Sequence, residues 1–333
     1  MVSLCRVKTP VLVIGGAGYI GSHTAFLLKQ AGYPVVVYDN LSTGHIQAVE
    51  ALDLPLERGD IRDRECLGAV LDKHKIGAVM HFAALALVGE STRFPARYFD
   101  VNVGGTATLA QEMCARGIAP LVFSSTCAVY GAPETLPVTE ANAKAPESPY
   151  GHSKWMAEQI LASCSSEGLR AARLRYFNAA GAHPEGLLGE SHRPETHLIP
   201  LVIQAALGQR PPLQVYGRDY PTPDGTCVRD YIHVMDLARA HLAALEYLLA
   251  GGDGDAWNIG TGHGTSVLEI IRAVEAVTGR TVPREDAPRR DGDPARIWAH
   301  PSAAQAALGW TPQWTDLEDI VRTAWQWAQA PKY

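Results

Sequence analysis

The chain has 333 residues, 47% of them apolar, and a formal net charge of −6, which supports a substantial core in one large or two modest domains. The charges are dispersed with no basic run, and this argues against nucleic acid as the main partner, because a phosphate-binding face needs clustered Lys and Arg. No apolar stretch approaches the ~20 residues that a membrane span needs, so we expect no membrane association.

The first half of the chain alternates between strand-like and helix-like segments. Short apolar runs occupy residues 11–16, 33–40, 78–84, 121–126 and 170–178. Helical patterns lie between them, one running from the first run to about residue 31 and a long one covering about residues 94–116. Continuous apolar strands that alternate with helices predict a parallel sheet with helices on both faces.

The amino-acid composition of the chain changes after Asn178. Residues 179–230 are rich in Gly, Pro and His and contain one clear helical pattern, at about residues 201–207. Regular patterns resume as helices at about 235–249, 266–278 and 315–328, and as a strand at 256–260. We therefore predict a larger α/β domain over residues 1–178 with returning segments at about 230–260. A smaller mixed α/β domain takes residues 179–229 and 261–333.

A glycine turn follows the first apolar run. Gly15, Gly18 and Gly21 form a GxxGxxG pattern between a strand and a helix, where glycine lets the backbone approach a pyrophosphate at the helix N-terminus. Asp39 ends the second strand about 20 residues later and can accept both ribose hydroxyls of an adenosine. This carboxylate would repel a 2′-phosphate, so the pair of features predicts a Rossmann-type fold that binds NAD rather than NADP.

Tyr150 and Lys154 are four residues apart in SPYGHSK, at the start of a helix. This spacing puts both side chains on one helix face. A tyrosine acts as a base when its pKa of about 10 falls toward neutrality. We expect the Lys154 ammonium and the positive ring of oxidised nicotinamide to lower that pKa by ~3 units.

Seven motifs extend these features over most of the chain. They are GGAGYIGSH, DNLSTGH, HFAALALVGES, FSSTCAVYG, SPYGHSK, RYFNAAGAHPEG and DGTCVRDYIHVMDLARAH. In them the chain resembles the extended short-chain dehydrogenase/reductases and, more narrowly, the UDP-glucose 4-epimerase family, from about residue 10 to 328. The resemblance implies that the larger predicted domain binds NAD and the smaller one binds a UDP-sugar.

The resemblance also implies particular contacts with NAD. Beyond Gly15, Gly18, Gly21 and Asp39, the implied cofactor-binding residues are Tyr19, Ile20, Asn40, Leu41, Ser42, Thr43, Gly44, Asp60, Ile61, Phe82, Ala83, Ala84, Leu85, Ala86, Asn102, Ser124, Tyr150, Lys154 and Phe177. Some family members have a lysine at the position of Ala86 that reaches the cofactor, and an alanine lacks that reach.

The implied substrate contacts are Thr126, Tyr150, Asn178, His197, Leu198, Tyr216, Arg229, Arg290, Asp293 and Ile297. The fork of an arginine guanidinium suits a diphosphate, which agrees with this role for Arg229 and Arg290. Ile297 corresponds to the position whose bulk decides whether an N-acetylated sugar fits. An ordinary core isoleucine explains it equally well.

The catalytic residues that the resemblance implies are Tyr150, Lys154 and Thr126. Tyr150 takes the proton of the 4-hydroxyl while hydride passes from C4 to NAD, the 4-keto sugar turns over, and hydride and proton return to invert C4. Related dehydratases and decarboxylases carry acids directly after the hydroxyl of Thr126. Cys127 and Ala128 stand there in this chain, which favours return of the hydride.

The expected function is therefore interconversion of UDP-galactose and UDP-glucose, with UDP-xylose/UDP-arabinose or UDP-N-acetylhexosamine as alternative substrates. A dehydratase or decarboxylase, and an NAD-binding sensor without catalysis, are the remaining rivals.

The family implies a homodimer through helices near 94–116 and 150–166. The six cysteines show no CxxC and no paired spacing, which is typical of reduced thiols in a cytoplasmic protein. His183, His192 and His197 lie near Glu185, Glu190 and Glu195, but without a short HxxxH spacing we predict no metal site.

Overall fold

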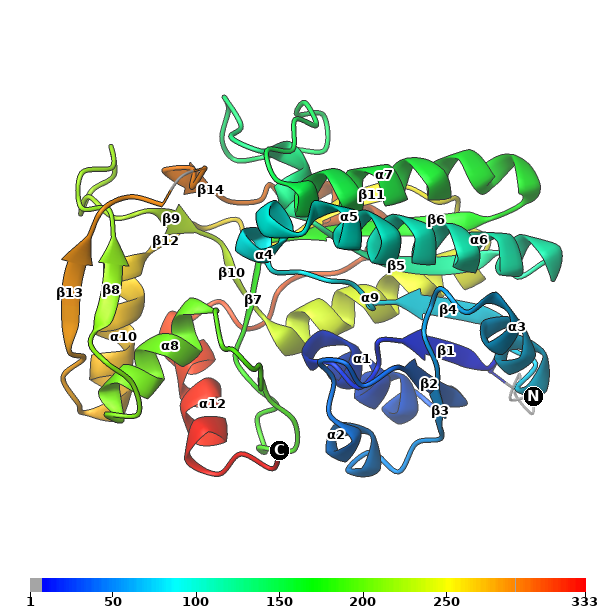
Figure 1. Cartoon of the computed structure of the whole chain (residues 1–333), viewed down its shortest axis with the longest axis horizontal. Helices are drawn as coiled ribbons and strands as arrows, with labels where there is room; N and C mark the ends of the chain where they lie inside the picture. The colour runs from blue at the N-terminus through cyan, green and yellow to red at the C-terminus, as the bar shows by residue number, and fades with distance from the viewer. Residues whose placement is uncertain (1–7, 291) are drawn as a thin grey trace.

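A seven-stranded sheet forms the centre of the computed structural model, which describes residues 8–290 and 292–333 (Figure 1). Its strands are β1 Val11–Ile14, β2 Val35–Asp39, β3 Leu56–Arg58, β4 Ala78–His81, β5 Pro120–Thr126, β6 Arg170–Tyr176 and β11 Ala256–Ile259. They lie in the order β11-β6-β5-β4-β1-β2-β3, with every pairing parallel. The predicted doubly wound α/β fold is confirmed, and residues 1–7 of the predicted first domain lie outside the described residues.

Helices cover both faces of this sheet because its strands are apolar on both sides. In β1, Val11 and Val13 belong to one core and Leu12 and Ile14 to the other. Helices α1 and α9 pack on the first face and α3, α6 and α7 on the second. The bounds of these and the adjoining helices are α1 Tyr19–Gln30, α2 Ile46–Glu50, α3 Arg64–Lys73, α4 Val88–Arg93, α7 Pro149–Ser163, α9 Val234–Leu249 and α11 Ser302–Leu308.

The helix predicted over residues 94–116 is divided into three parts. It consists of α5 Pro95–Tyr98, a π-helical segment Phe99–Gly104 and α6 Gly105–Ala115. A Cβ atom at Gly105 would lie 2.5 Å from a methyl group of Ile61, so glycine allows this helix to approach the loop after β3. Wide π turns of this kind occur frequently at functional sites.

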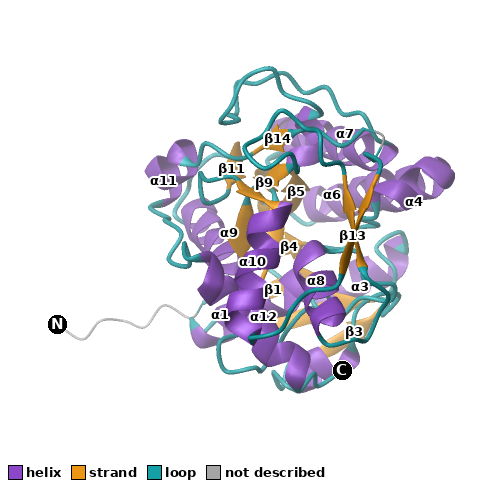
Figure 2. Ribbon diagram, turned by 90° about the vertical axis from the view of Figure 1, so that its left-hand side faces the viewer, coloured by secondary structure: helices purple, strands orange, loops and turns teal. Residues whose placement is uncertain are grey.

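A smaller apolar core lies beside the sheet, at the left of Figure 1 (Figure 2 gives the view from that side). It is built by α8 Leu198–Ala206, α10 Val267–Thr278 and α12 Leu317–Gln329, with the parallel pair β8 Leu213–Tyr216 and β13 Arg284–Ala287. Helix α8 begins three residues before its predicted start, because Pro200 is accommodated in the first helical turn, where its missing N–H costs nothing.

Short strands connect the two cores. Strand β7 Asn178–Ala180 pairs with β10 Tyr231–His233, and β9 Val228–Arg229 pairs with both β12 Thr265–Ser266 and β14 Arg296–Ile297. Between β9 and β10, the fully buried Asp230 accepts hydrogen bonds from the amides of Thr261 (2.9 Å) and Ala299 (3.2 Å). This carboxylate therefore fixes the segment that carries Arg229 against the end of β11.

The predicted strand at 256–260 returns to the main sheet as β11, beside β6. The domain boundaries themselves stay a prediction. Within residues 8–290 and 292–333, no helix combines the length and the apolar composition that crossing a bilayer requires.

Candidate functional site

The carboxyl ends of the parallel strands meet at one edge of the sheet, and most of the predicted site residues lie there. The turn after β1 requires glycine at two positions. Gly15 has a φ of +78°, and a Cβ atom there would lie 2.5 Å from the amide nitrogen of Ala83. A Cβ atom at Gly21 would lie 2.2 Å from the carbonyl oxygen of Gly15. Helix α1 begins at Tyr19 without a side-chain cap, so its first turn presents backbone N–H groups suited to a pyrophosphate.

Asp39 ends β2 beside this turn and is largely buried. One carboxylate oxygen accepts a hydrogen bond from the amide of Ala17 (3.0 Å) and the other from the amide of Leu41 (2.8 Å). Burial raises the pKa of the Asp39 carboxyl, and these two hydrogen bonds oppose that change. Each oxygen keeps a further lone pair for a ribose hydroxyl.

The loop from Asn40 to Gly44 packs on the glycine turn, because a Cβ atom at Gly44 would lie 2.9 Å from Ala17. Asn40 donates to Asp60 at 3.1 Å, which joins the ends of β2 and β3. The carboxylate of Asp60, predicted to bind the cofactor, already forms a hydrogen bond with Arg62 at 2.8 Å. Asp60 therefore shapes this side of the site, with Ile61 buried behind it.

Asn102 holds the loop after β4, which contains residues 82–86. Its side-chain oxygen accepts from the amide of Leu85 (2.9 Å), and its nitrogen donates to the Leu85 carbonyl (3.0 Å) and to the hydroxyl of Ser153 (2.9 Å). This side chain, predicted to contact the cofactor, thus connects the π-helical segment, the loop and helix α7.

Thr126, Tyr150 and Lys154 come together at the ends of β5 and α7. Ser148 caps α7 by accepting a hydrogen bond from the amide of Gly151 (3.1 Å), and Pro149 opens the helix. The Lys154 ammonium donates to the carbonyl of Ser124 at 2.6 Å. The side chain of Thr126 forms a hydrogen bond with Tyr150. The three predicted catalytic residues therefore share one location.

The expected fall in the pKa of Tyr150 is not produced by the protein alone. Burial raises the pKa of the Tyr150 phenol, and the hydrogen bond with Thr126 opposes this rise only in part. Burial lowers the pKa of the Lys154 ammonium to about 7, and the charge of Glu158 opposes that fall. The prediction that Lys154 and an oxidised nicotinamide together favour the phenolate stays a prediction, because it depends on the charge of bound NAD as well as on the protein.

The segment after Thr126 carries no charge. Residues Cys127–Tyr130 form a 3-10 turn, and Thr126 accepts a hydrogen bond from the amide of Ala128 (3.1 Å). Burial raises the pKa of the Cys127 thiol to about 12, so this side chain remains neutral. Behind the turn, Phe177 and Ile297 are buried in one apolar cluster, which places Ile297 among core side chains.

A pocket of about 230 Å³ lies between the start of β7 and the smaller core. Seven of the predicted substrate-binding residues line it: Asn178, His197, Leu198, Tyr216, Arg229, Arg290 and Asp293. Arg229 forms an ion pair with Asp293, and the Arg290 guanidinium lies 4.0 Å from the centre of the Tyr216 ring. The predicted contacts Thr126, Tyr150 and Ile297 are not part of this lining.

Arg210 also lines this pocket, although it was not predicted as a binding residue from the sequence. Its Nη1 atom is buried and has no hydrogen-bond partner among the residues that the structure describes. Three arginines therefore border one pocket, which suits a ligand with several negative charges. No motif singles out Arg210, because it follows α8 in an unremarkable GQRPP stretch.

His197 belongs to a cluster of two histidines and two glutamates. His192 Nδ1 lies 3.3 Å from Glu190 and 3.4 Å from Glu195, and His197 Nδ1 lies 2.5 Å from Glu190 and 3.5 Å from Glu195. Such a set of donors resembles a metal site. Each imidazole is already paired with carboxylates, however, and the absence of a metal stays a prediction. His183 and Glu185, named with them in the sequence, lie outside this cluster.

The carboxylates change how these histidines titrate. Burial lowers the pKa of His192, but hydrogen bonds with Glu190 and Glu195 outweigh it and raise this pKa to about 9. Burial alone would raise the pKa of Glu195, whereas hydrogen bonds with His192 and His197 hold it well below its usual range. The cluster therefore contains charged pairs at neutral pH.

Comparisons with known proteins agree with this site. The model of the NAD dependent epimerase/dehydratase family matches residues 11–260. A UDP-glucose 4-epimerase from Rhizobium leguminosarum bv. trifolii is 54% identical over 318 residues, covering 95% of this chain and 96% of that protein.

Two solved structures resemble the whole chain. The structure of UDP-glucose 4-epimerase from Brucella ovis in complex with NAD is 50% identical, with a TM-score of 0.93, and covers 96% of this chain and 98% of that one. The enzyme from Bifidobacterium longum in complex with NAD⁺ and UDP is 40% identical, with a TM-score of 0.92, at coverages of 96% and 98%.

The cluster predicts a pH-dependent stability. Because the folded-state pKa of His192 lies above its ordinary value of 6.5, its ion pairs stabilise the fold fully below pH 6.5, and this contribution is lost as the pH rises through about 9. We expect the difference in free energy of unfolding between wild type and His192→Asn to be larger at pH 6 than at pH 9.5, measured by urea denaturation. The exposed His263→Asn supplies the background, and an equal difference at both pH values would contradict the assignment.

Proposed function

This chain belongs to the NAD dependent epimerase/dehydratase family, and from that premise we propose that it is a UDP-glucose 4-epimerase. It would interconvert UDP-galactose and UDP-glucose through transient oxidation at C4 of the sugar, with a tightly bound NAD. The observation that carries this proposal is the convergence of Thr126, Tyr150 and Lys154 at the sheet edge, followed by the uncharged Cys127 and Ala128.

The residues after β1 and β2 fit NAD. Glycines 15 and 21 let the turn pack closely, because a Cβ atom at either position would collide with backbone, and the uncapped first turn of α1 offers N–H groups to a pyrophosphate. Asp39 has free lone pairs at the end of β2. We propose that the remaining residues predicted from the resemblance, in the loops after β2, β3, β4 and β6, line the same site. When bound, NAD supplies the hydride acceptor and donor of the reaction.

Tyr150 is the proposed base and acid. It would take the proton of the 4-hydroxyl in the first half of the cycle and return one in the second. Because burial raises the pKa of Tyr150, the phenolate requires nearby positive charge, which Lys154 and an oxidised nicotinamide would provide together. Thr126 would hold the 4-oxygen beside the phenol and assist the proton transfer.

The pocket that contains Arg229 and Arg290 is the proposed site of the UDP moiety. Arg229 is held by Asp293 and Arg290 is stacked on Tyr216, so both guanidinium groups are positioned before a diphosphate arrives. Asn178, His197 and Leu198 line the same pocket. Tyr216 and the neighbouring apolar residues offer a surface for the uracil ring.

Epimerisation is favoured over the rival reactions because no acid follows Thr126. Elimination of water or loss of carbon dioxide needs further proton transfer at a neighbouring carbon, and the protonated thiol of Cys127, with a pKa of about 12, is unsuited to it. The alternative substrates UDP-xylose, UDP-arabinose and UDP-N-acetylhexosamine are less favoured, because the matched curated relatives are named UDP-glucose 4-epimerases.

We also propose a homodimer and a cytoplasmic location. Val88, Phe94 and Met156 are exposed apolar side chains on or beside helices α4, α5 and α7, which contact one another and would form the interface. Within the described chain the five cysteines are free, as expected in a reducing compartment. A sedimentation mass equal to that of one chain would contradict the dimer, and release with the periplasmic fraction would contradict the location.

The first test is the reaction itself. Purified protein mixed with UDP-galactose, without added NAD, should produce a steady mixture of UDP-galactose and UDP-glucose, followed through the anomeric signals by proton NMR. Tyr150→Phe retains the ring and should slow this conversion by about 10²- to 10⁴-fold, with extractable NAD unchanged. A 4-keto-6-deoxy product, or an unchanged spectrum from protein that contains NAD, would contradict the proposal.

The second test concerns the diphosphate. Arg290→Ala should raise the KM for UDP-galactose by about 10-fold or more with kcat nearly unchanged, because the contact is made equally in the ground and transition states. Its neighbour Arg289 offers a matched control. Arg289 pairs with Asp219 and does not line the pocket, so Arg289→Ala should leave KM unchanged. Equal effects of the two substitutions would remove Arg290 from the site.

A further inference from the structure

A buried carboxylate lies directly behind the proposed catalytic residues. Glu158 is on α7, one helical turn after Lys154 and two turns after Tyr150, and its side chain is fully buried. One of its oxygens accepts a hydrogen bond from the hydroxyl of Ser125 at 2.5 Å. Because Ser125 precedes Thr126 in β5, this contact connects the helix that carries the proposed base to the strand that carries the threonine.

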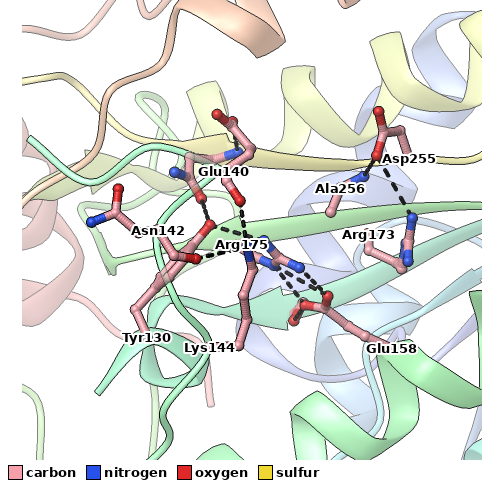
Figure 3. Close-up of polar contacts among 11 residues, drawn as sticks. Tyr130, Glu140, Asn142, Lys144, Glu158, Arg173, Arg175, Asp255 and Ala256 are labelled. Carbon is pink, nitrogen blue, oxygen red and sulfur yellow. Dashed lines mark hydrogen bonds and ion pairs between the residues drawn. The ribbon is translucent and has the colours of Figure 1, made fainter. Parts of the chain in front are cut away.

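Arg175 neutralises this carboxylate from the neighbouring strand. Its guanidinium donates to both oxygens of Glu158, through Nε at 2.9 and 3.1 Å and through Nη2 at 2.5 Å (Figure 3). The side chain of Arg175 is 4% exposed and that of Glu158 is 0% exposed. The pair therefore joins α7, β5 and β6 at one buried point.

The network continues from Arg175 toward the loop that leads into α7. Arg175 Nη1 donates to the hydroxyl of Tyr130 (2.9 Å), which donates to Asn258 in β11 (2.7 Å). The amide of Asn258 in turn donates to Glu140 (2.7 Å), in the loop before Ser148. These hydrogen bonds therefore tie β6 and β11 to the loop that leads into α7.

We propose that Glu158 and Arg175 are positioning residues for the reaction, fixing α7 against the ends of β5 and β6 so that Tyr150, Lys154 and Thr126 keep their mutual geometry. Glu158 also supplies negative charge beneath Lys154. The inference rests on the proposed function. A buried ion pair is costly, and an apolar pair of the same volume is often as stabilising, so stability alone does not account for it.

The charge of Glu158 acts on a lysine whose surroundings favour loss of its proton. Burial lowers the pKa of Lys154 to about 7, and Glu158 is the group that opposes this fall. The other titratable groups near Lys154 do not replace it. Burial keeps His81 of β4 neutral by lowering its pKa to about 3, and Tyr176 of β6 has its pKa raised to about 12.

Tyr150 and Arg175 complete the surroundings of this lysine. The pKa of Tyr150 is raised by burial, and Arg175 is positively charged. With Glu158 neutralised, Arg175 would add unpaired positive charge, and the pKa of Lys154 would fall further. Lys154 would then lose its proton at a lower pH, and the alkaline limit of activity would move in the same direction.

Three variants of the NAD-containing enzyme separate positioning from stability. Glu158→Gln removes the charge but leaves Arg175 buried and unpaired, so it should also lower Tm. The double variant Glu158→Gln/Arg175→Met has no unpaired buried charge and should recover Tm. Glu112→Gln is the matched control, because Glu112 is a buried carboxylate paired with Arg64 and Arg116 between α3 and α6.

The measurements are Tm, kcat and KM for UDP-galactose over a pH series, and the pKa of Lys154. The last is followed by ¹³C NMR of lysine labelled at Cε, assigned with Lys154→Met, and needs no substrate. We expect the double variant to keep a kcat at least ~10-fold below wild type with KM within ~3-fold. The pKa of Lys154 should be about one pH unit lower in Glu158→Gln, and lower by a smaller amount in the double variant, which also lacks the positive charge of Arg175. Glu112→Gln should lower Tm and change neither kcat nor Lys154.

A double variant with the kcat and the Lys154 pKa of wild type would overturn the proposal, because the pair would then be structural only. The same conclusion follows if Glu112→Gln lowers kcat as much as Glu158→Gln does. A wild-type protein that leaves UDP-galactose unchanged would contradict the proposed function, whereas a lower Lys154 pKa in the variants would still support the electrostatic role of Glu158.

Discussion

The site of this molecule lies at the carboxyl edge of the sheet because helices cover both faces of the sheet and leave no room there for a ligand. All seven strands are parallel, the central strands β1 and β2 are apolar on both sides, and helices cover both faces. Polar groups are therefore gathered where the strands end. Gly15, Asp39 and Thr126 come from distant parts of the sequence, and the parallel topology brings these strand ends to one edge.

Burial at this edge has a cost that the site must offset. The phenol of Tyr150 and the ammonium of Lys154 both lose hydration. The pKa of the phenol rises and that of the ammonium falls, so burial favours the neutral form of each group. A base that is useful at neutral pH therefore depends on the positive charges of the ligand and of Lys154, whose protonation Glu158 of α7 favours. The same desolvation strengthens every charge interaction that remains in the cleft.

Local spacing explains what the sequence could predict. The glycine turn, Asp39, and the pair Tyr150 and Lys154 are each set by a strand end or by one helical turn, so their relation is visible in the linear chain. The strands of the sheet, including β11, could also be predicted from the sequence, because uninterrupted apolar runs are distinctive. The substrate-pocket residues came from family resemblance, since Arg229 and Arg290 are joined by no local pattern.

Other features of the site depend on tertiary contacts and leave no pattern in the sequence. Glu158 and Arg175 are 17 residues apart on different elements, and neither belongs to a spacing rule. The cluster of Glu190, His192, Glu195 and His197 forms because one irregular segment folds back on itself. The rise in the pKa of Tyr150 that the protein alone causes was not predicted, because the burial of this side chain is a property of the packed structure.

The two cores are interleaved along the chain, and this limits how the protein could be divided or recombined. Helix α9 and strand β11 complete the large sheet, although the chain has already built β8 and α8 of the smaller core. A fragment that ends after β6 would expose one face and one edge of the sheet. An exchange of the smaller core between related proteins would therefore require three junctions, one after β6 and one on either side of residues 234–259, rather than a single cut.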